Sequence, residues 1–133
     1  MAERKKRVLI VDDDATLVKM MQIYFKNSGM ETHIETRGLK AIEAIGSFNP
    51  DVMILDIMMP EMDGIKVCRK IRTELGNHTL PIIALTGFHK EEREKQIMAA
   101  GANLYLTKPI EMSKLLSHVK TLAAGQGGSQ AQT

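Results

Sequence analysis

Four short, unbroken runs of apolar residues constrain the fold of this 133-residue chain more strongly than any other feature. None of them alternates with polar residues, which is typical of strands buried on both faces of a parallel sheet. Segment 31–36 is weaker, with β-branched residues between polar ones, and it predicts a strand at the edge of the sheet. The unbroken runs are Val8–Val11, Val52–Leu55, Ile82–Leu85 and Leu104–Leu106.

The segments between these runs have helical periodicity. Asp14 is a candidate N-cap for the first helix, and Gly29 is its expected C-terminal stop. A fourth helix is expected over about 90–100, ending at Gly101, and a fifth over about 112–123. Alternating strands and helices predict an α/β fold, with five parallel strands covered on both faces by five helices. The stripes expected to face inward are Leu17, Met20, Met21, Tyr24 and Phe25; Leu39, Ile42 and Ile45; Ile65, Cys68, Ile71 and Leu75; and Leu115, Leu116, Val119 and Leu122.

Length and composition predict one globular domain. The chain is long enough for a hydrophobic core but too short for two domains of ordinary size. Apolar residues make up 44% and charged residues 26%, which excludes intrinsic disorder. The single Cys68 cannot form an internal disulfide, and no apolar run is long enough for a membrane span or a signal peptide. We therefore expect a cytoplasmic protein without membrane contact.

The net charge of +2 comes from one end of the chain. Residues 1–7 form a basic leader with four basic side chains, and the rest of the chain has 14 basic and 15 acidic residues. Together with the absence of Trp and the scarcity of other aromatic residues, this favours a solvated leader over nucleic-acid binding. Residues 125–133 are rich in Gly and Gln and predict a flexible tail or the start of a linker.

Polar residues follow, or end, each unbroken run. Because the carboxyl ends of parallel strands lie along one edge of the sheet, where α/β proteins bind ligands, we expect these side chains to converge. Each one alone has an ordinary explanation as a cap, a turn residue or a loop charge, but four such strand ends together indicate a site. The residues are Asp12, Asp13 and Asp14 after the first run, Asp56 after the second, Thr86 after the third, and Thr107 and Lys108 after the fourth.

These groups suit phosphoryl transfer. Clustered carboxylates repel one another, and Mg²⁺, which prefers oxygen ligands and keeps open positions, removes that cost. Lys108 adds a positive charge beside the same group, and the Thr86 hydroxyl can donate to a phosphoryl oxygen. A carboxylate can itself act as the nucleophile and become an aspartyl phosphate.

At this point the chain resembles the receiver domain of two-component response regulators, of the CheY-like kind. The resemblance covers about residues 6–124 and implies a receiver domain over 8–124. It also implies a doubly wound, flavodoxin-like sheet with strand order 2-1-3-4-5. The matching segments are Val8-Leu-Ile-Val-Asp-Asp13, Leu55-Asp-Ile-Met-Met-Pro-Glu-Met-Asp-Gly64, Ala84-Leu-Thr-Gly87, Gly101-Ala102 and Tyr105-Leu-Thr-Lys-Pro109.

The resemblance implies a role for each matching residue. Asp56 would accept a phosphoryl group from the phosphohistidine of a sensor histidine kinase or a phosphotransfer protein. Asp13 and Asp56 would bind Mg²⁺ directly, Asp12 would bind it through water, and the backbone carbonyl of Met58 would add an oxygen. Lys108 would pair first with Asp56 and then with the phosphoryl group.

Further residues would transmit or shape the response. Thr86 would move toward the phosphoryl group, and Tyr105 would fill the space it leaves. Pro109 would follow a cis peptide bond, while Asp63 and Gly64 would shape the loop before the third helix. The output surface, residues 90–122, would change its affinity for a downstream protein and is a candidate for a phosphorylation-dependent homodimer.

Some questions stay open at this stage. Met58 and Phe88 flank the site and are expected to tune the access of water. The chain is either a complete single-domain regulator or a receiver whose output domain is missing.

The alternative to a switch is an enzyme, since Leu9–Thr16 also resembles the first motif of haloacid dehalogenase-like phosphatases, with Asp12 as nucleophile. Phosphatases of that family need an acidic pair on a later strand, which this sequence lacks, and the interpretation gives no role to Asp56. We therefore expect a phospho-accepting switch rather than an enzyme.

Overall fold

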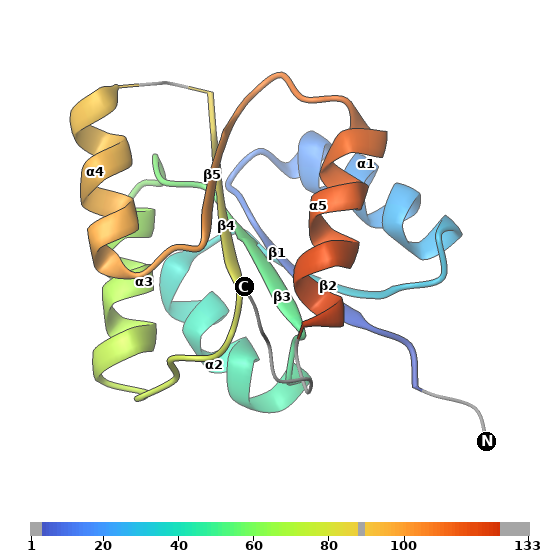
Figure 1. The fold of residues 1–133 in the computed structure, drawn as a ribbon, viewed down its shortest axis with the longest axis horizontal. Coiled ribbons are helices and arrows are strands. Elements are labelled where there is room, and N and C mark those ends of the chain that lie inside the picture. The colour runs from blue at the N-terminus through green and yellow to red at the C-terminus, as the bar shows by residue number, and fades with distance from the viewer. Residues whose placement is uncertain (1–3, 88–89, 126–133) are drawn as a thin grey trace.

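The computed structural model describes residues 4–87 and 90–125 of the chain. Strands and helices alternate throughout these residues, as the hydrophobic pattern predicts (Figure 1). The strands are β1 (Arg7–Val11), β2 (Glu31–Glu35), β3 (Val52–Leu55), β4 (Ile82–Thr86) and β5 (Leu104–Thr107). The helices are α1 (Ala15–Asn27), α2 (Gly38–Phe48), α3 (Gly64–Thr73), α4 (Glu91–Ala100) and α5 (Met112–Ala124).

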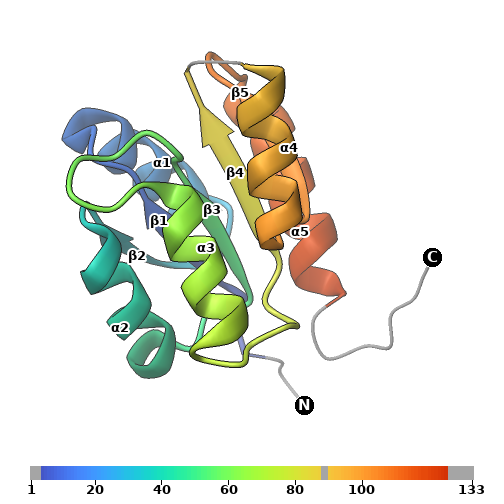
Figure 2. The same cartoon turned by 90° about the vertical axis from the view of Figure 1, so that its left-hand side faces the viewer.

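The five strands form one parallel sheet in the order β2-β1-β3-β4-β5, which confirms the predicted topology. β1 lies between β2 and β3, and its Ile10 pairs with Ile34 of β2 and with Ile54 of β3. β2 is an edge strand, as its mixed composition predicts. In Figures 1 and 2, α1 and α5 cover one face of the sheet, and α2, α3 and α4 cover the other.

The unbroken apolar runs are explained by two cores, one on each face of the sheet. Leu9 and Met53 face the core shared with α2, α3 and α4, whereas Ile10 and Ile54 face the core shared with α1 and α5. Successive side chains of a strand point to opposite faces, so a strand covered on both sides buries every residue. All four residues of β3 are accordingly buried.

The predicted helix boundaries are largely confirmed. The Asp14 side chain accepts a hydrogen bond from the Leu17 amide at 3.1 Å and caps α1. Gly29 and Gly101 have φ angles of +89° and +118° just beyond α1 and α4, where a residue with a Cβ is disfavoured. Three residues of the predicted stripes are instead exposed, namely Met20 on α1, Leu39 on α2 and Leu75. Leu75 is exposed because it lies beyond the end of α3.

Arg4 and Lys5, in the part of the basic leader that the structure describes, are exposed to solvent, and Arg4 also forms an ion pair with the body of the domain. Both terminal nitrogens of Arg4 donate to the carboxylate of Asp51, at 2.9 and 3.0 Å, and the Arg7 amide donates to the same carboxylate. Asp51 precedes β3 and is buried, so these contacts balance its charge. Arg7 is itself the first residue of β1.

Two other expectations concern residues that the structure does not describe, namely the tail beyond Gly125 and the position of Phe88. Among the helices in the described part of the chain, none has the length and apolar character required to cross a membrane.

Candidate functional site

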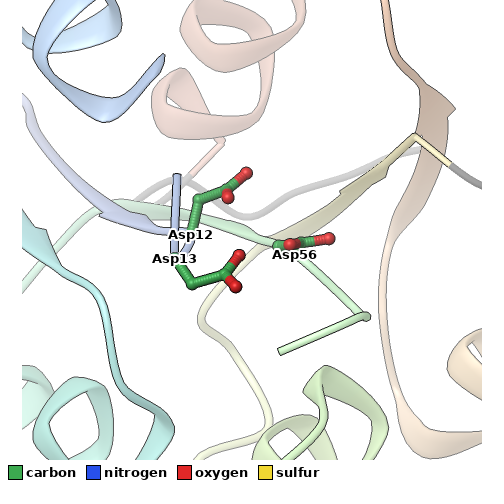
Figure 3. Close-up of side chains that lie close together, drawn as sticks. All are labelled: Asp12, Asp13 and Asp56. Carbon is green, nitrogen blue, oxygen red and sulfur yellow. The ribbon is translucent and has the colours of Figure 1, made fainter. Parts of the chain in front are cut away.

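The carboxyl ends of β1 and β3 bring three carboxylates together. The ladder continues past both strands, because the Asp12 amide donates to the Glu35 carbonyl and the Asp56 amide donates to the Val11 carbonyl at 2.9 Å. One carboxylate oxygen each from Asp12, Asp13 and Asp56 lies within 4.8 Å of the others (Figure 3). Residues 44 positions apart in sequence therefore form one acidic cluster at the predicted edge of the sheet.

Burial gives the three carboxylates different properties. Asp12 and Asp56 are only 2% and 5% exposed, whereas Asp13 is exposed to solvent. Burial, followed by repulsion from Asp12, raises the pKa of Asp56 to about 6, while Lys108 acts in the opposite direction. Ionisation of Asp56 therefore costs free energy when no cation is bound.

Lys108 is paired with Asp12 rather than with Asp56. Its Nζ donates to Asp12 Oδ2 at 2.6 Å across 96 residues of sequence. The resemblance implied a pair with Asp56, whereas the hydrogen bond that the structure shows is to Asp12. The charge of Lys108 also acts on Asp56, whose pKa it lowers.

Asp56 is also tied to the loop that follows it. The Met58 amide donates to Asp56 Oδ1 at 3.2 Å, and the Gly64 amide donates to the Ile57 carbonyl at 2.8 Å. The Asp63 side chain then caps α3 by accepting from the Lys66 amide at 2.9 Å. The loop from Asp56 to α3 is therefore held at both ends by hydrogen bonds.

Gly64 is required by close backbone packing. A Cβ at this position would overlap with the Asp56 carbonyl oxygen and lie 2.8 Å from the Ile57 Cα, and both are backbone atoms that cannot turn aside as a flexible side chain can. We expect Gly64→Ala to lower the free energy of unfolding by about 2–3 kcal/mol, measured by urea denaturation. The matched control is Gly46→Ala in α2, where nothing lies within 4 Å, and it should stabilise the protein by roughly 0.5–1 kcal/mol. Equal stability of the two variants would contradict this packing argument.

The remaining predicted residues lie along β4, β5 and the segment after β5. Thr86 ends β4 and is 1% exposed, and its carbonyl accepts from the Lys108 amide at 2.8 Å. Tyr105 lies on β5, half-buried beside the core that includes α4. Its burial, and secondarily the charge of Glu94, raise the pKa of the phenol. The Lys108–Pro109 peptide bond is cis, as the resemblance implied.

The acidic cluster fits a divalent cation such as Mg²⁺. Its donors are three hard oxygen ligands, two of them buried, and the exposed Asp13 leaves access from solvent. The raised pKa of Asp56 is the electrostatic cost that a cation would remove. Of the other strand-end residues, Asp14 caps α1 and is not part of the cluster, and Thr107 lies exposed at the end of β5.

The stability of the metal-free protein should depend on the ionisation of Asp56. Because its folded pKa of about 6 exceeds the ordinary 3.8, the folded state binds the proton more tightly, and stability is lost as pH rises from about 4 through 6. We expect Asp56→Asn to remove this loss, so that the variant gains about 3 kcal/mol over wild type at pH 7.5 and almost nothing at pH 4. Denaturation in chelator at both pH values tests this, and a gain that is equal at the two pH values would refute it.

Arg93 contacts the rim of the site, and the sequence motifs did not identify this residue. Its Nη2 lies 3.7 Å from the Met58 Sδ, across 35 residues of sequence. No local signal distinguishes Arg93 from the other charged residues of α4, because the contact depends on how α4 packs beside the loop after β3.

The strand order and the flanking helices define an α/β domain of the doubly wound class, with a carboxylate cluster that could hold a cation at the carboxyl edge of its sheet. The chain belongs to the response regulator receiver domain family, whose family model matches residues 8–120. It is thus a receiver domain of the two-component response regulators. Members of this family interact with sensor kinases, and receiver domains generally bind Mg²⁺.

Curated relatives include the DNA-binding response regulator MtrA of Mycobacterium tuberculosis, which is 34% identical over 116 residues. The match covers 87% of this chain and 50% of MtrA. The response regulator MprA of Mycobacterium ulcerans is also 34% identical, with 87% of this chain and 49% of MprA covered. The chain therefore spans about half the length of the curated relatives it matches.

Solved structures agree with this assignment. A putative response regulator from Chloroflexus aurantiacus has a TM-score of 0.82 and 34% identity, with 90% of this chain and 98% of that chain covered. A CheY-like receiver domain protein from Methanospirillum hungatei has a TM-score of 0.85 and 26% identity, covering 92% and 96% respectively.

Proposed function

We propose that this domain is a phosphorylation-dependent switch in which Asp56 accepts a phosphoryl group from a phosphohistidine. The donor is a sensor histidine kinase or a phosphotransfer protein. The observation that carries the proposal is the position of Asp56, buried beside two further carboxylates and within the field of Lys108. The receiver domain is proposed to span residues 8–124, with its output effected by a downstream protein or an output domain.

The proposed step exchanges one phosphorus bond for another. A carboxylate oxygen of Asp56 forms a bond to phosphorus, the bond from phosphorus to the donor's imidazole nitrogen breaks, and that nitrogen keeps the electron pair. The product is an acyl phosphate on Asp56, which water later hydrolyses to restore the carboxylate. Apart from these reactions of its own side chain, the domain is proposed to have no enzymatic activity.

The residues around Asp56 have distinct proposed roles. Asp13, Asp56 and the Met58 carbonyl would hold Mg²⁺ directly, with Asp12 acting through water, and the ion supplies neutralisation of phosphoryl charge when bound. Lys108 would exchange its Asp12 partner for a phosphoryl oxygen. The buried position of Thr86 supports a role for its hydroxyl as a donor to the same group.

The switch is proposed to act through β4 and β5. Thr86 and Tyr105 lie on these adjacent strands, and Tyr105 packs against the core below α4. Movement of Thr86 toward a phosphoryl group would favour an inward Tyr105 and so shift an equilibrium between two arrangements of residues 90–122. That surface would bind the downstream protein or, alternatively, a second copy of the domain.

Beryllofluoride, which mimics a phosphoryl group on a carboxylate, tests the switch. With Mg²⁺ present, we expect amide NMR signals to shift at Asp56 and also across residues 90–122. The proposed switch would be refuted by shifts that stop at the acidic cluster. The haloacid dehalogenase-like alternative differs because it requires Asp12, rather than Asp56, to bind beryllofluoride.

Recognition of the phosphoryl donor is proposed to use an apolar cavity beside Lys108. The cavity has a volume of about 460 Å³ and extends from the exposed Met20 of α1 to Ile110 before α5. The stem of Lys108 lines it, so an apolar donor surface seated here would lie next to the acceptor site.

We expect Met20→Glu to slow transfer from a phosphorylated sensor kinase by about tenfold, because it places a charge in this cavity. Phosphorylation by acetyl phosphate should be unchanged, since a small donor needs no docking surface. Leu39→Glu on α2 is the control, as Leu39 is equally exposed but does not line the cavity. The docking role would be wrong if Met20→Glu and Leu39→Glu transferred at the wild-type rate.

A further inference from the structure

Arg93, in the first turn of α4, has a guanidinium group that donates only to neutral acceptors within the described part of the chain. Its Nη2 donates to the Met58 Sδ at 3.7 Å, and its Nη1 donates to the Gln96 Oε1 at 3.3 Å. A thioether and an amide are neutral acceptors, and sulfur is a weak one. Among the residues that the structure describes, no ion pair includes Arg93, in contrast to Lys108, which is bonded to Asp12.

Met58 links this guanidinium to the acceptor carboxylate. The Met58 amide donates to Asp56 Oδ1 at 3.2 Å, while its side chain is 46% exposed and extends to Arg93. Arg93 thus lies at the rim of the site. It is not among the groups whose charge acts appreciably on Asp56, which are Asp12, Lys108 and Asp13.

The space around Arg93 allows it to move. A hollow of about 320 Å³ lies between Met58 and α4, lined also by Lys90, Glu92 and Gln96. The guanidinium can leave its two neutral acceptors without breaking an ion pair, which would be the main resistance to such a movement.

Phosphorylation would create the partner that Arg93 lacks. An acyl phosphate on Asp56 adds negative charge and strong acceptor oxygens two residues from Met58. We propose that Arg93 is a second cationic ligand of the phosphoryl group, which rests against Met58 in the unphosphorylated domain and turns to Asp56 when it is modified. This inference rests on the proposed function of Asp56, and it would couple the modification directly to the first turn of α4.

Beryllofluoride titration of the Mg²⁺-saturated domain tests the proposal. We expect Arg93→Ala to weaken beryllofluoride binding about fivefold, because one charge-assisted contact is lost. Arg93→Lys should recover part of the affinity, since a cation remains. Lys95→Ala is the matched control, because it removes the same charge from an exposed position of the same helix that does not line the hollow.

A second measurement separates contact from general stabilisation. The ¹H–¹⁵N signal of the Arg93 Nε–H, assigned by its absence in Arg93→Ala, should shift when beryllofluoride binds to wild type, and the affinity for Mg²⁺ alone should not weaken in the variant. The proposal is overturned if the signal does not shift, or if Arg93→Ala binds beryllofluoride as tightly as Lys95→Ala. Failure of wild type to bind beryllofluoride at all would instead overturn the proposed function of Asp56.

Discussion

Replacement of Asp56 by Asn is expected to abolish formation of a phosphoryl adduct. Intact-mass measurement after incubation with acetyl phosphate and Mg²⁺ should detect the adduct on wild type and none on Asp56→Asn. The physical reason is that the amide has no anionic oxygen to attack phosphorus, while its size and shape leave the site intact. The same substitution removes the carboxylate whose ionisation costs stability, so the loss cannot be attributed to unfolding.

Asp12→Asn is the informative comparison. It changes a carboxylate of the same cluster that is just as buried, but it leaves Asp56 in place. We expect this variant to form the adduct more slowly, yet still to form it. An adduct that persists in Asp56→Asn and disappears in Asp12→Asn would contradict the account and favour the phosphatase-like alternative.

The second large effect concerns Mg²⁺. We expect Asp13→Asn to weaken Mg²⁺ binding at least about tenfold, because a hard, charged ligand is replaced by a neutral one in a cluster of three carboxylates. Chelation of Mg²⁺ should suppress phosphorylation by acetyl phosphate in wild type to a similar or greater degree. Isothermal titration calorimetry and the initial rate of adduct formation measure the two effects.

Asp14→Asn is the control for Mg²⁺ binding. It removes one negative charge next to the cluster, but Asn caps a helix as well as Asp does, so α1 should be unaffected. If only the local field attracts the cation, Asp13→Asn and Asp14→Asn will weaken binding equally. Direct ligation predicts that Asp13→Asn has much the larger effect, and equal effects would contradict it.

The fold could be predicted because its main determinants are local. Val8–Val11 and Val52–Leu55 are apolar at every position, and only strands covered on both faces explain such runs together with the helical stripes between them. The site could be predicted for a related reason. Once the strands are parallel, Asp12 and Asp56 must lie at the same edge, whatever the details of packing.

The partners of charged side chains could not be predicted in the same way. Lys108 bonds to Asp12, 96 residues away in the sequence, and no sequence pattern shows which carboxylate of the cluster it bonds to. The ion pair of Arg4 could not be predicted either, because its partner, Asp51, is 47 residues away.

Arg72 is a further case of a long-range contact hidden from the sequence. It is 9% exposed although it is charged, and its guanidinium donates to the Gly101 carbonyl at 2.8 Å and to the Asn103 side chain at 3.1 Å. Besides the φ angle of +118°, the same arginine disfavours a side chain at Gly101, since a Cβ there would lie 2.7 Å from the Arg72 Cγ. From the sequence, Gly101 was recognisable as a helix stop and as part of the family resemblance, but not as a residue that packs against Arg72.

The location of the phosphoryl group on the wild-type chain tests the central claim most directly. Borohydride reduction after treatment with acetyl phosphate and Mg²⁺ converts an aspartyl phosphate to homoserine, which peptide mass spectrometry can assign to a position. We expect homoserine at position 56 and nowhere else in the acidic cluster. Homoserine at position 12 or 13, with Asp56 unmodified, would contradict it.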